Sequence, residues 1–404
     1  MEFVFTPEQE VLRHEIQEFL AEHLTPEVMA ENDTADVVRE RGPHTRALYQ
    51  KIAERGWLAA SWPKRWGGQE RSKTDQYIIE EEFSRAGLSV GAGGTGAPAI
   101  LAAGTDAQKE EFIAASIRGE VVFAQGYTEP GAGADLAGLR CRAVRDGDEY
   151  VINGQKTFTT GAHLCTHIYL MTRTDPDAGR RDGISIFLVP LNLPGIAIRP
   201  LWTIQNDPPA PAGTTYGESR TNEVFFADVR VPASSRLGPE NEGWYIGQRG
   251  LSLDRVGARR YLMSVQRDED IVNWLKDPAA DDDRAELRDD PVVRDTVAGL
   301  WIEAQVCRLM TMRSLSIQEH DAPFSYEASA EKVWAPEHGV RATEAIAQIL
   351  GAPGQLLSTS PDAVQRGVFA HNLMGAFQSG INHGSVQVMR DQVARHGWQM
   401  PRSR

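Results

Sequence analysis

The sequence has few cysteines, no long hydrophobic run and fewer basic than acidic residues, and each shortage excludes a class of protein. The three cysteines, Cys141, Cys165 and Cys307, do not have the spacing of metal ligands, and their odd number provides no disulfide framework. No stretch approaches the roughly 20 apolar residues that a membrane-spanning helix needs. The first residues form neither a basic leader nor a hydrophobic signal segment. We therefore expect no metal site and no membrane span, and we expect the protein in the cytoplasm.

The charge balance argues against nucleic acid as a partner. The net charge is −14, whereas nucleic acid binding depends on Lys and Arg side chains that neutralise phosphates. The same net charge does not exclude an anionic small molecule held by a few local cations. With 404 residues, 41% of them hydrophobic and 24% charged, the chain has the composition of a globular protein and the length of two or three packed units.

Hydrophobic periodicity changes twice along the chain and divides it into three blocks. Residues 1–118 contain amphipathic helical runs, the first of which begins at the Thr6-Pro7 cap. Residues 119–236 contain short strand-like runs, and residues 237–404 return to helical spacing. Helices, strands and helices in separate blocks predict an α+β fold with three domains over these ranges.

Turn signals refine the middle block. Asp146-Gly147 and Asn153-Gly154 are both typical of tight β-hairpins. Residues 207–217, rich in proline and glycine, predict an irregular surface loop. The strands that we expect are 150–152, 167–171, 184–189 and 223–226.

In the third block, a long helix is expected over about residues 242–275, followed by a charged, solvated connector over 277–290. Cys307 lies on an apolar stripe at helical spacing, and we interpret it as a core residue rather than a nucleophile. The further helices are expected at about 292–319, 325–350 and 361–396.

A glycine-rich run, Gly91-Ala-Gly-Gly-Thr-Gly96, matches the pattern of dinucleotide-binding loops. That mechanism needs a strand before the glycines and a helix after them, so that a pyrophosphate meets the helix N-terminus. Here a helical run precedes the glycines. We therefore interpret them as a turn or as a loop that lines a pocket.

Two segments about 20 residues apart carry the chemical signal. The first is Phe123-Ala-Gln-Gly-Tyr-Thr-Glu-Pro-Gly-Ala-Gly-Ala-Asp135, and the second is Asn153-Gly-Gln-Lys-Thr-Phe-Thr-Thr160. In the first, Gly131 and Gly133 allow a ligand to approach the backbone closely. In the second, Phe158 is an aromatic plate that can stack on a flat ring. Thr128 and Thr160 add hydroxyl donors without charge.

Together and in this order, the two segments resemble the two flavin-contacting signatures of the acyl-CoA dehydrogenase family. Hairpin turns and structural threonines would explain either segment alone. The resemblance extends to residues 56–68, 222–232 and 238–244 and so covers most of the chain. It is weakest over 207–217 and 276–290.

The resemblance implies an N-terminal helical domain, a middle antiparallel β-barrel-like domain and a C-terminal helical bundle. It also implies FAD, with the isoalloxazine ring between the strand domain and the helices. Tyr127 and Thr128 would contact the pyrimidine side of the ring. Phe158 would pack on the ring, and Thr160 would hydrogen-bond near N5. The residues assigned to FAD in this way are Tyr127, Thr128, Gly133, Ala134, Phe158, Thr160, Gln348 and Gly351.

The implied reaction is α,β-desaturation of an acyl-CoA thioester, with an electron-transfer flavoprotein or a similar protein as acceptor. A carboxylate in a dry pocket must remove the α-proton. One family position for this base precedes an arginine on the long helix, where this chain has Asp254 followed by Arg255. The other precedes the last helix, where His383 stands. We predict Asp254 as the base and leave open His383 as the base, or a chain that has no working base.

Aspartate is shorter than the glutamate of the family by one carbon–carbon bond, about 1.5 Å. Such a deficit can cost about 100-fold in rate if the backbone does not compensate. Arg255 is interpreted as a buried structural cation paired with the strand layer. Arg255 and His383 are also kept as candidates for contact with substrate.

Some segments depart from the pattern of homomeric family members, in which two segments reach the FAD of a neighbouring subunit. The first, Arg-x-x-Phe-Gly, is missing from residues 266–290, and the second is altered at Ala352 and Pro353. Ala134 also replaces the serine that is usual before Asp135. These losses resemble the actinobacterial acyl-CoA dehydrogenases of steroid side-chain breakdown, which combine two unlike subunits.

The resemblance therefore predicts a homo- or hetero-oligomer with a paralogous subunit and a bulky, steroid-type acyl group, without excluding short acyl chains. Two alternatives remain open. The chain could be a non-catalytic subunit that completes the flavin site of a related chain. It could also be a flavin oxidase or monooxygenase on the same scaffold.

Overall fold

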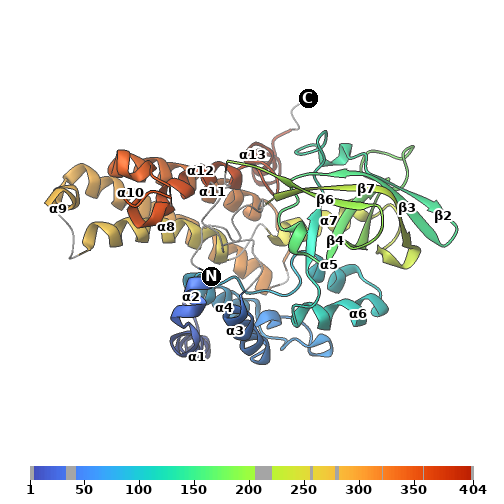
Figure 1. Cartoon of the computed structure of the whole chain (residues 1–404), viewed down its shortest axis with the longest axis horizontal. Helices are drawn as coiled ribbons and strands as arrows, with labels where there is room; N and C mark the ends of the chain where they lie inside the picture. Colours follow the sequence, from blue (N-terminus) through green and yellow to red (C-terminus); the bar gives the residue numbers. More distant parts are fainter. Residues whose placement is uncertain are drawn as a thin grey trace.

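The computed structural model describes residues 4–32, 42–204, 221–254, 258–277, 282–320, 322–357 and 359–401. In Figure 1, one group of helices lies along the lower edge, the sheet lies on the right, and a second group of long helices extends to the left. Helices, strands and helices thus follow one another as the periodicity predicts, and the α+β fold class is confirmed. The predicted loop over 207–217 and Arg255 lie outside the described residues.

The N-terminal helices form a layer around an aromatic core. Thr6 caps the first helix and exchanges hydrogen bonds with Gln9, as the cap signal predicts. Trp57 and Phe83 are buried in a cluster that also includes residues of a C-terminal helix, such as Tyr261. The helices are α1 (Pro7–His23), α2 (Pro26–Asn32), α3 (Pro43–Glu54), α4 (Lys73–Arg85), α5 (Gly96–Ala103) and α6 (Asp106–Ile117).

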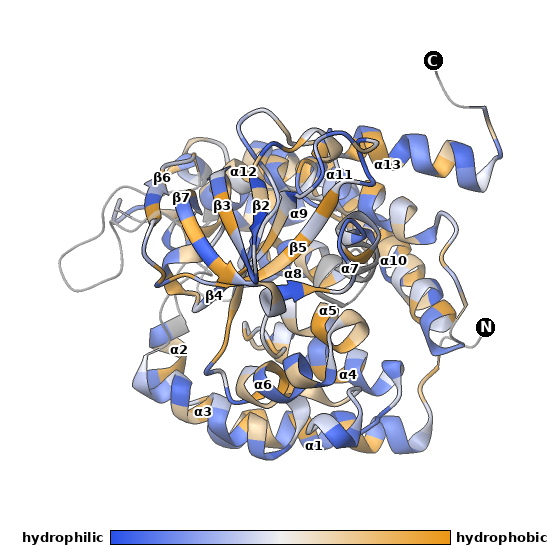
Figure 2. Cartoon of the chain, turned by 90° about the vertical axis from the view of Figure 1, so that its right-hand side faces the viewer, coloured by the Kyte–Doolittle hydropathy of each residue, from blue (hydrophilic) through white to orange (hydrophobic). Residues whose placement is uncertain are grey.

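The middle of the chain forms an eight-stranded sheet in the order β6-β7-β3-β2-β4-β5-β8, with β1 beside β4. The prediction of an antiparallel domain is wrong in one respect, because β1 and β2 both pair with β4 in parallel. In Figure 2, β4 and β5 are largely hydrophobic, as expected for strands buried on both faces. The strands are β1 (Phe123–Gly126), β2 (Arg142–Asp146), β3 (Glu149–Lys156), β4 (His167–Arg173), β5 (Ile184–Pro190), β6 (Ile196–Leu201), β7 (Thr221–Pro232) and β8 (Arg236–Leu237).

One of the two predicted hairpin turns is confirmed and the other is wrong. Asp146 ends β2, and Gly147, with φ of 63°, turns the chain into β3. Asn153-Gly154 instead lies inside β3, at a bulge opposite β7. The Asn153 side chain exchanges hydrogen bonds of 3.0 Å with Asp228 of β7, which holds the strand in the sheet. A Cβ on Gly154 would lie 2.7 Å from Cα of Cys141, so the bulge requires glycine.

The C-terminal helices pack mainly on one another and on the N-terminal layer. The predicted connector over 277–290 contains a helix, α9, and is therefore corrected. The predicted helix over 361–396 is divided, because His383 and Gly384 both have positive φ between α12 and α13. Cys307 is fully buried, as predicted. The helices are α7 (Gly243–Asp254), α8 (Ala258–Lys276), α9 (Asp282–Asp289), α10 (Pro291–Glu319), α11 (Glu327–Leu350), α12 (Val368–Ser379) and α13 (Val386–Gln392).

Two negative findings concern the described part of the chain. None of its helices combines the length and the apolarity that crossing a bilayer requires. Within the same residues, no three His, Cys, Asp or Glu side chains are grouped so that they could hold a metal ion.

Candidate active site

The two signature segments, distant in sequence, lie side by side where β1 and β3 end. The N–H of Thr157 donates to the carbonyl oxygen of Thr128 at 2.9 Å. Lys156 Nζ donates to the carbonyl oxygen of Tyr127 at 3.0 Å and to Glu129 Oε1 at 2.8 Å. Lys156 and Glu129 are both buried. The fold therefore joins the two segments into one platform.

Phe158 has an unusual conformation on this platform. Its φ is 54°, in the left-handed region, and its side chain is 62% exposed. Such a backbone costs on the order of 1 kcal/mol for a residue other than glycine. The neighbouring Thr159 is buried, and its Oγ1 has no hydrogen-bond partner among the described residues. A strained, exposed aromatic side chain beside an unpartnered hydroxyl is the arrangement of a binding surface that is completed by a ligand.

The start of β7 holds the second segment from its other side. The N–H of Thr159 donates to the carbonyl oxygen of Asn222 at 2.9 Å, and the Asn222 amide donates back to Thr159 at 3.3 Å. Thr160 is exposed, and its Oγ1 lies 3.3 Å from Oγ1 of Thr221. Asn222 also lies 3.0 Å from Nδ1 of His163. The backbone of the predicted contact residues is thus fixed by residues to which the sequence assigned no role in the site.

The glycines of the first segment form an open rim. A Cβ built on Gly131 or Gly133 would meet no atom within 4 Å, and Gly133 and Ala134 are exposed. Glu129 and Ala132 exchange two backbone hydrogen bonds of 3.0 Å, which close the turn at its base. The rim has the space for a ligand close to the backbone that the glycines predict.

Burial disfavours the thiolate form of the two cysteines near this platform. Burial raises the pKa of the Cys141 thiol to about 11, and Glu129 raises it while Lys156 opposes the shift. Burial likewise raises the pKa of Cys165 to about 11. Both thiols are therefore protonated at neutral pH.

Helix α7, which carries the predicted base, packs against the platform. A Cβ on Gly247 of α7 would lie 3.1 Å from Oη of Tyr127 and 2.5 Å from Cε of Met171, so helix and platform pack closely. Asp254 ends α7 seven residues later. This is two helical turns, or about 10 Å along the axis, at nearly the same angular position. The side chain of Asp254 lies outside the described part of the chain.

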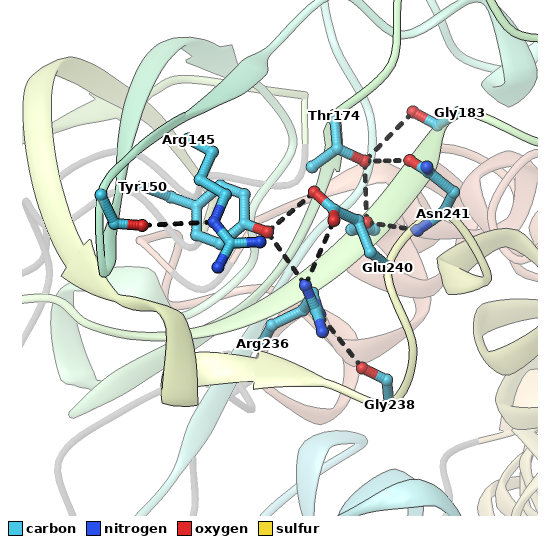
Figure 3. A network of polar contacts seen from close by, with 10 residues as sticks. Arg145, Tyr150, Thr174, Gly183, Arg236, Gly238, Glu240 and Asn241 are labelled. Atoms are coloured by element: carbon cyan, nitrogen blue, oxygen red, sulfur yellow. Dashed lines mark hydrogen bonds and ion pairs between the residues drawn. The ribbon is translucent and has the colours of Figure 1, made fainter.

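A polar network fixes the chain where it leaves the sheet for α7 (Figure 3). Arg236 of β8 donates to Oη of Tyr150 at 2.9 Å, and this hydroxyl donates to Glu240 at 2.7 Å. Asn241 accepts from Thr174 at 2.6 Å, and its N–H donates to Ser185 at 2.8 Å. The start of α7 is therefore held by side chains from β3, β5 and β8 and by the residue after β4.

The fold does not bring Gln348 and Gly351 to the platform within one chain. Gln348 and Gly351 lie at the end of α11, where Leu350 packs with Leu275 and Val293. Leu275 and Val293 flank α9, which lies at the opposite end of the molecule from the sheet in Figure 1. His383 is half-buried in the turn between α12 and α13.

The glycine-rich run 91–96 has no strand before it. The preceding element is α4, and α5 begins at Gly96. Gly93 and Gly94 have φ of 68° and 63°, and a Cβ on Gly94 would lie 3.0 Å from the carbonyl oxygen of Phe123. The glycines thus form a turn that packs against the start of β1, in agreement with the interpretation as a turn.

Comparisons with known proteins agree with the resemblance. Three family models match the chain: the acyl-CoA dehydrogenase N-terminal domain at residues 6–120, the middle domain at 124–216 and the C-terminal domain at 241–397. Acyl-CoA dehydrogenase FadE26 of Mycobacterium tuberculosis (strain ATCC 25618 / H37Rv) is 33% identical, with 100% of both chains covered. FadE29 of the same strain is 34% identical, with 98% of each chain covered.

Solved structures agree as well. The Tcur3481-Tcur3483 steroid ACAD matches with a TM-score of 0.83 at 32% identity, and 100% of both chains is covered. The ChsE4-ChsE5 complex from Mycobacterium tuberculosis matches with a TM-score of 0.84 at 32% identity and the same coverage. Each of these two assemblies is named for two components. The family resemblance inferred from the two segments is confirmed.

Proposed function

The chain belongs to the acyl-CoA dehydrogenase family, and from this premise we propose that it uses FAD to desaturate an acyl-CoA thioester between the α and β carbons. One observation supports this proposal above the others. The Thr157–Thr128 hydrogen bond of 2.9 Å joins the two signature segments beside the exposed, left-handed Phe158. The same premise supports the three predicted domains, 1–118, 119–236 and 237–404.

The residues present fit a flavin. Phe158 offers an exposed ring to a flat aromatic system. The buried Thr159 hydroxyl has no protein partner among the described residues, and the rim at Gly133 and Ala134 is open. Thr160 is exposed beside Phe158 and can donate its hydroxyl proton. FAD, when bound, supplies the acceptor for the hydride that leaves the β-carbon.

The protein's part in the chemistry is removal of the α-proton. We propose that Asp254 performs this step, because α7 packs on Tyr127 and carries Asp254 two turns further along. Exclusion of water would raise the pKa of this carboxyl toward working pH and make it a better base. Arg255 and His383 remain the predicted candidates for contact with substrate.

We propose a bulky, steroid-type acyl group as substrate. The support is the full-length similarity to the structure titled a steroid ACAD. An electron-transfer flavoprotein or similar protein is the proposed acceptor, and the cytoplasm is the proposed compartment.

We further propose that a paralogous subunit completes the flavin site. Gln348 and Gly351 lie at the end of the bundle near α9, and they could meet a flavin only on another chain. The similar ChsE4-ChsE5 structure is titled a complex. Apolar side chains on the C-terminal elements are also exposed, among them Phe377, Ile381 and Trp398. The same observation favours a second candidate function, a non-catalytic subunit that completes the site of its partner.

One experiment separates these functions. The purified chain, alone and mixed with a paralogous subunit, is scanned for flavin absorbance and then titrated anaerobically with short-chain and steroid-type acyl-CoA thioesters. Bleaching with an enoyl product supports the dehydrogenase, and stronger bleaching with the steroid thioester supports the bulky substrate. An assembly that binds flavin and bleaches equally well when Asp254 is replaced indicates the non-catalytic subunit. Rapid reoxidation by air with release of peroxide indicates the oxidase.

A further inference from the structure

We propose that the buried Glu129–Lys156 pair is a positioning device that orients the Tyr127–Thr128 peptide toward the flavin and so sets flavin affinity and redox potential. The inference rests on the proposed function, because it presumes that FAD binds at this platform. It concerns two buried residues that are not among the predicted flavin contacts.

The pair lies below the binding surface, and each partner also makes hydrogen bonds to the backbone. The Lys156 side chain is fully buried and the Glu129 side chain is 7% exposed, with Nζ 2.8 Å from Oε1. Glu129 also accepts from the N–H of Arg140 at 2.7 Å and from the N–H of Cys141 at 2.9 Å. Breaking a buried pair by removal of one partner leaves an uncompensated charge, so its geometry is strongly held.

The second bond of Lys156 orients a peptide group. Its Nζ donates to the carbonyl oxygen of Tyr127 at 3.0 Å, which directs that carbonyl into the protein interior. The described part of the chain contains no cis peptide bond. In a trans peptide the next N–H points opposite to the carbonyl. The N–H of Thr128 is therefore directed away from the interior, toward the ligand side of the platform.

This N–H has no acceptor among the described residues. None of the hydrogen bonds among the described residues has the Thr128 N–H as donor, although the Thr128 carbonyl accepts from Thr157. A preorganised backbone donor at a ligand surface stabilises negative charge that develops on the ligand. The pyrimidine side of a flavin carries carbonyl oxygens that such a donor can reach. Lys156 thus acts through the Tyr127–Thr128 peptide, and Glu129 holds Lys156 in place.

A direct electrostatic effect of the two charges would shift the flavin potential differently from a positioning effect. The pair carries no net charge, although its two opposite charges form a dipole. If the two charges acted directly, removal of the cation and removal of the anion would shift the flavin potential in opposite directions. If the pair positions the peptide, both removals lower the potential and weaken binding.

The test compares Lys156→Met, Glu129→Gln and Lys156→Arg with the wild type, in the assembly in which the wild type retains FAD. Arg230→Met is the matched control, because Arg230 pairs with Asp146 and Glu149 on the same sheet but is exposed. FAD affinity is measured by titration of the apoprotein, and the midpoint potential by dye equilibration. Thermal melting of each apoprotein reports folding.

We expect Lys156→Met to weaken FAD binding about tenfold, the effect of one hydrogen bond to a buried group, and to lower the potential. Glu129→Gln should change both quantities in the same direction by less, because the amide still accepts one bond. Lys156→Arg, which keeps the donor, should recover part of the affinity, and Arg230→Met should match the wild type.

Opposite potential shifts for Lys156→Met and Glu129→Gln would overturn the proposal. Wild-type affinity and potential in both variants would do the same. If Lys156→Met does not fold, Glu129→Gln and Lys156→Arg decide the outcome. A wild-type assembly that binds no FAD would overturn the proposed function itself, which is a separate result from variants that bind as the wild type does.

Discussion

The sheet and the C-terminal bundle differ in where they place their predicted site residues. At the ends of β1 and β3, three hydrogen bonds hold Tyr127, Thr128 and Glu129 against Lys156 and Thr157 within one chain. In the bundle, the predicted contact residues of α11 lie near α9, away from the sheet. The platform on the sheet is held together within one chain, whereas the residues of α11 are those that we propose to act on a second chain.

The two regions also differ in the hydrogen bonding of a buried acidic residue, Glu129 beside the sheet and Asp268 in the bundle. Glu129 accepts three hydrogen bonds, including one from Lys156. In the bundle, both carboxylate oxygens of the fully buried Asp268 lack a hydrogen bond from the described residues, and His338 Nε2 lies 3.6 Å away. The sheet satisfies its buried charge with fixed donors. The bundle leaves Asp268 in an environment that disfavours ionisation.

The largest expected effect concerns Asp254, at the end of the first helix of the bundle, α7. Asp254→Asn should lower the rate of anaerobic flavin bleaching by about 10²–10⁴-fold, because the general base is lost. Flavin absorbance should stay as in the wild type. Stopped-flow reduction with a saturating acyl-CoA measures this rate. Asp254→Glu and His383→Ala serve as controls, and a loss with His383→Ala but not with Asp254→Asn would transfer the role of base to the histidine.

A smaller effect tests whether Gln348 of the bundle contacts the flavin of another chain. Gln348→Ala should leave any flavin affinity of the isolated chain unchanged. In the assembly with a paralogous subunit it should weaken flavin retention about five- to tenfold, the loss of one hydrogen bond. Equilibrium dialysis of both forms measures the difference. Equal weakening in the isolated chain would contradict the division of roles between the two regions.

Phe158→Gly, on the platform beside the sheet, should weaken flavin binding while it stabilises the apoprotein. Loss of stacking should weaken flavin binding about three- to tenfold. The apoprotein should gain about 0.5–1 kcal/mol in free energy of unfolding, because glycine adopts a φ of 54° without strain. Urea unfolding of the apoprotein and flavin titration give the two values. A less stable apoprotein would show that Phe158 serves the fold rather than a ligand.

The smallest effect concerns Asp268. Burial raises the pKa of this carboxyl to about 7, with Arg267 opposing the shift and Glu303 adding to it. The folded state therefore holds a proton between pH 4 and 7 that the unfolded state has lost, and stability falls as pH rises through this window. Burial lowers the pKa of His338. This histidine makes a separate contribution, because the unfolded state binds its proton more readily, so stability falls as pH drops below the usual pKa of histidine.

Asp268→Asn removes the contribution of the aspartate alone. The melting temperature of the variant relative to the wild type should be higher at pH 8 than at pH 5, by about 1–2 °C for each kcal/mol of lost charge burial. Differential scanning calorimetry at the two pH values gives this comparison. The same offset at both would mean that Asp268 does not titrate in this range.

Much of the fold follows from local patterns. The Thr6 cap, the Asp146-Gly147 turn and the core position of Cys307 were predicted, because each depends on a few neighbouring residues or on helical spacing. Asn153-Gly154 was predicted wrongly, since pairing of Asn153 with Asp228 of β7 overrides its preference for a turn. The split between α12 and α13 was also missed, because nothing in the local pattern shows that His383 adopts a positive φ.

By itself, the sequence determined the α+β class, the family and the two segments that resemble the family's flavin-contacting signatures, because these depend on periodicity and on motifs of adjacent residues. Only the tertiary structure decided that Lys156 and Glu129 meet beneath those segments, that α7 packs on Tyr127, and that Gln348 lies away from them. These are contacts between distant parts of the chain. They depend on how helices and strands pack, which the order of residues along one element does not specify.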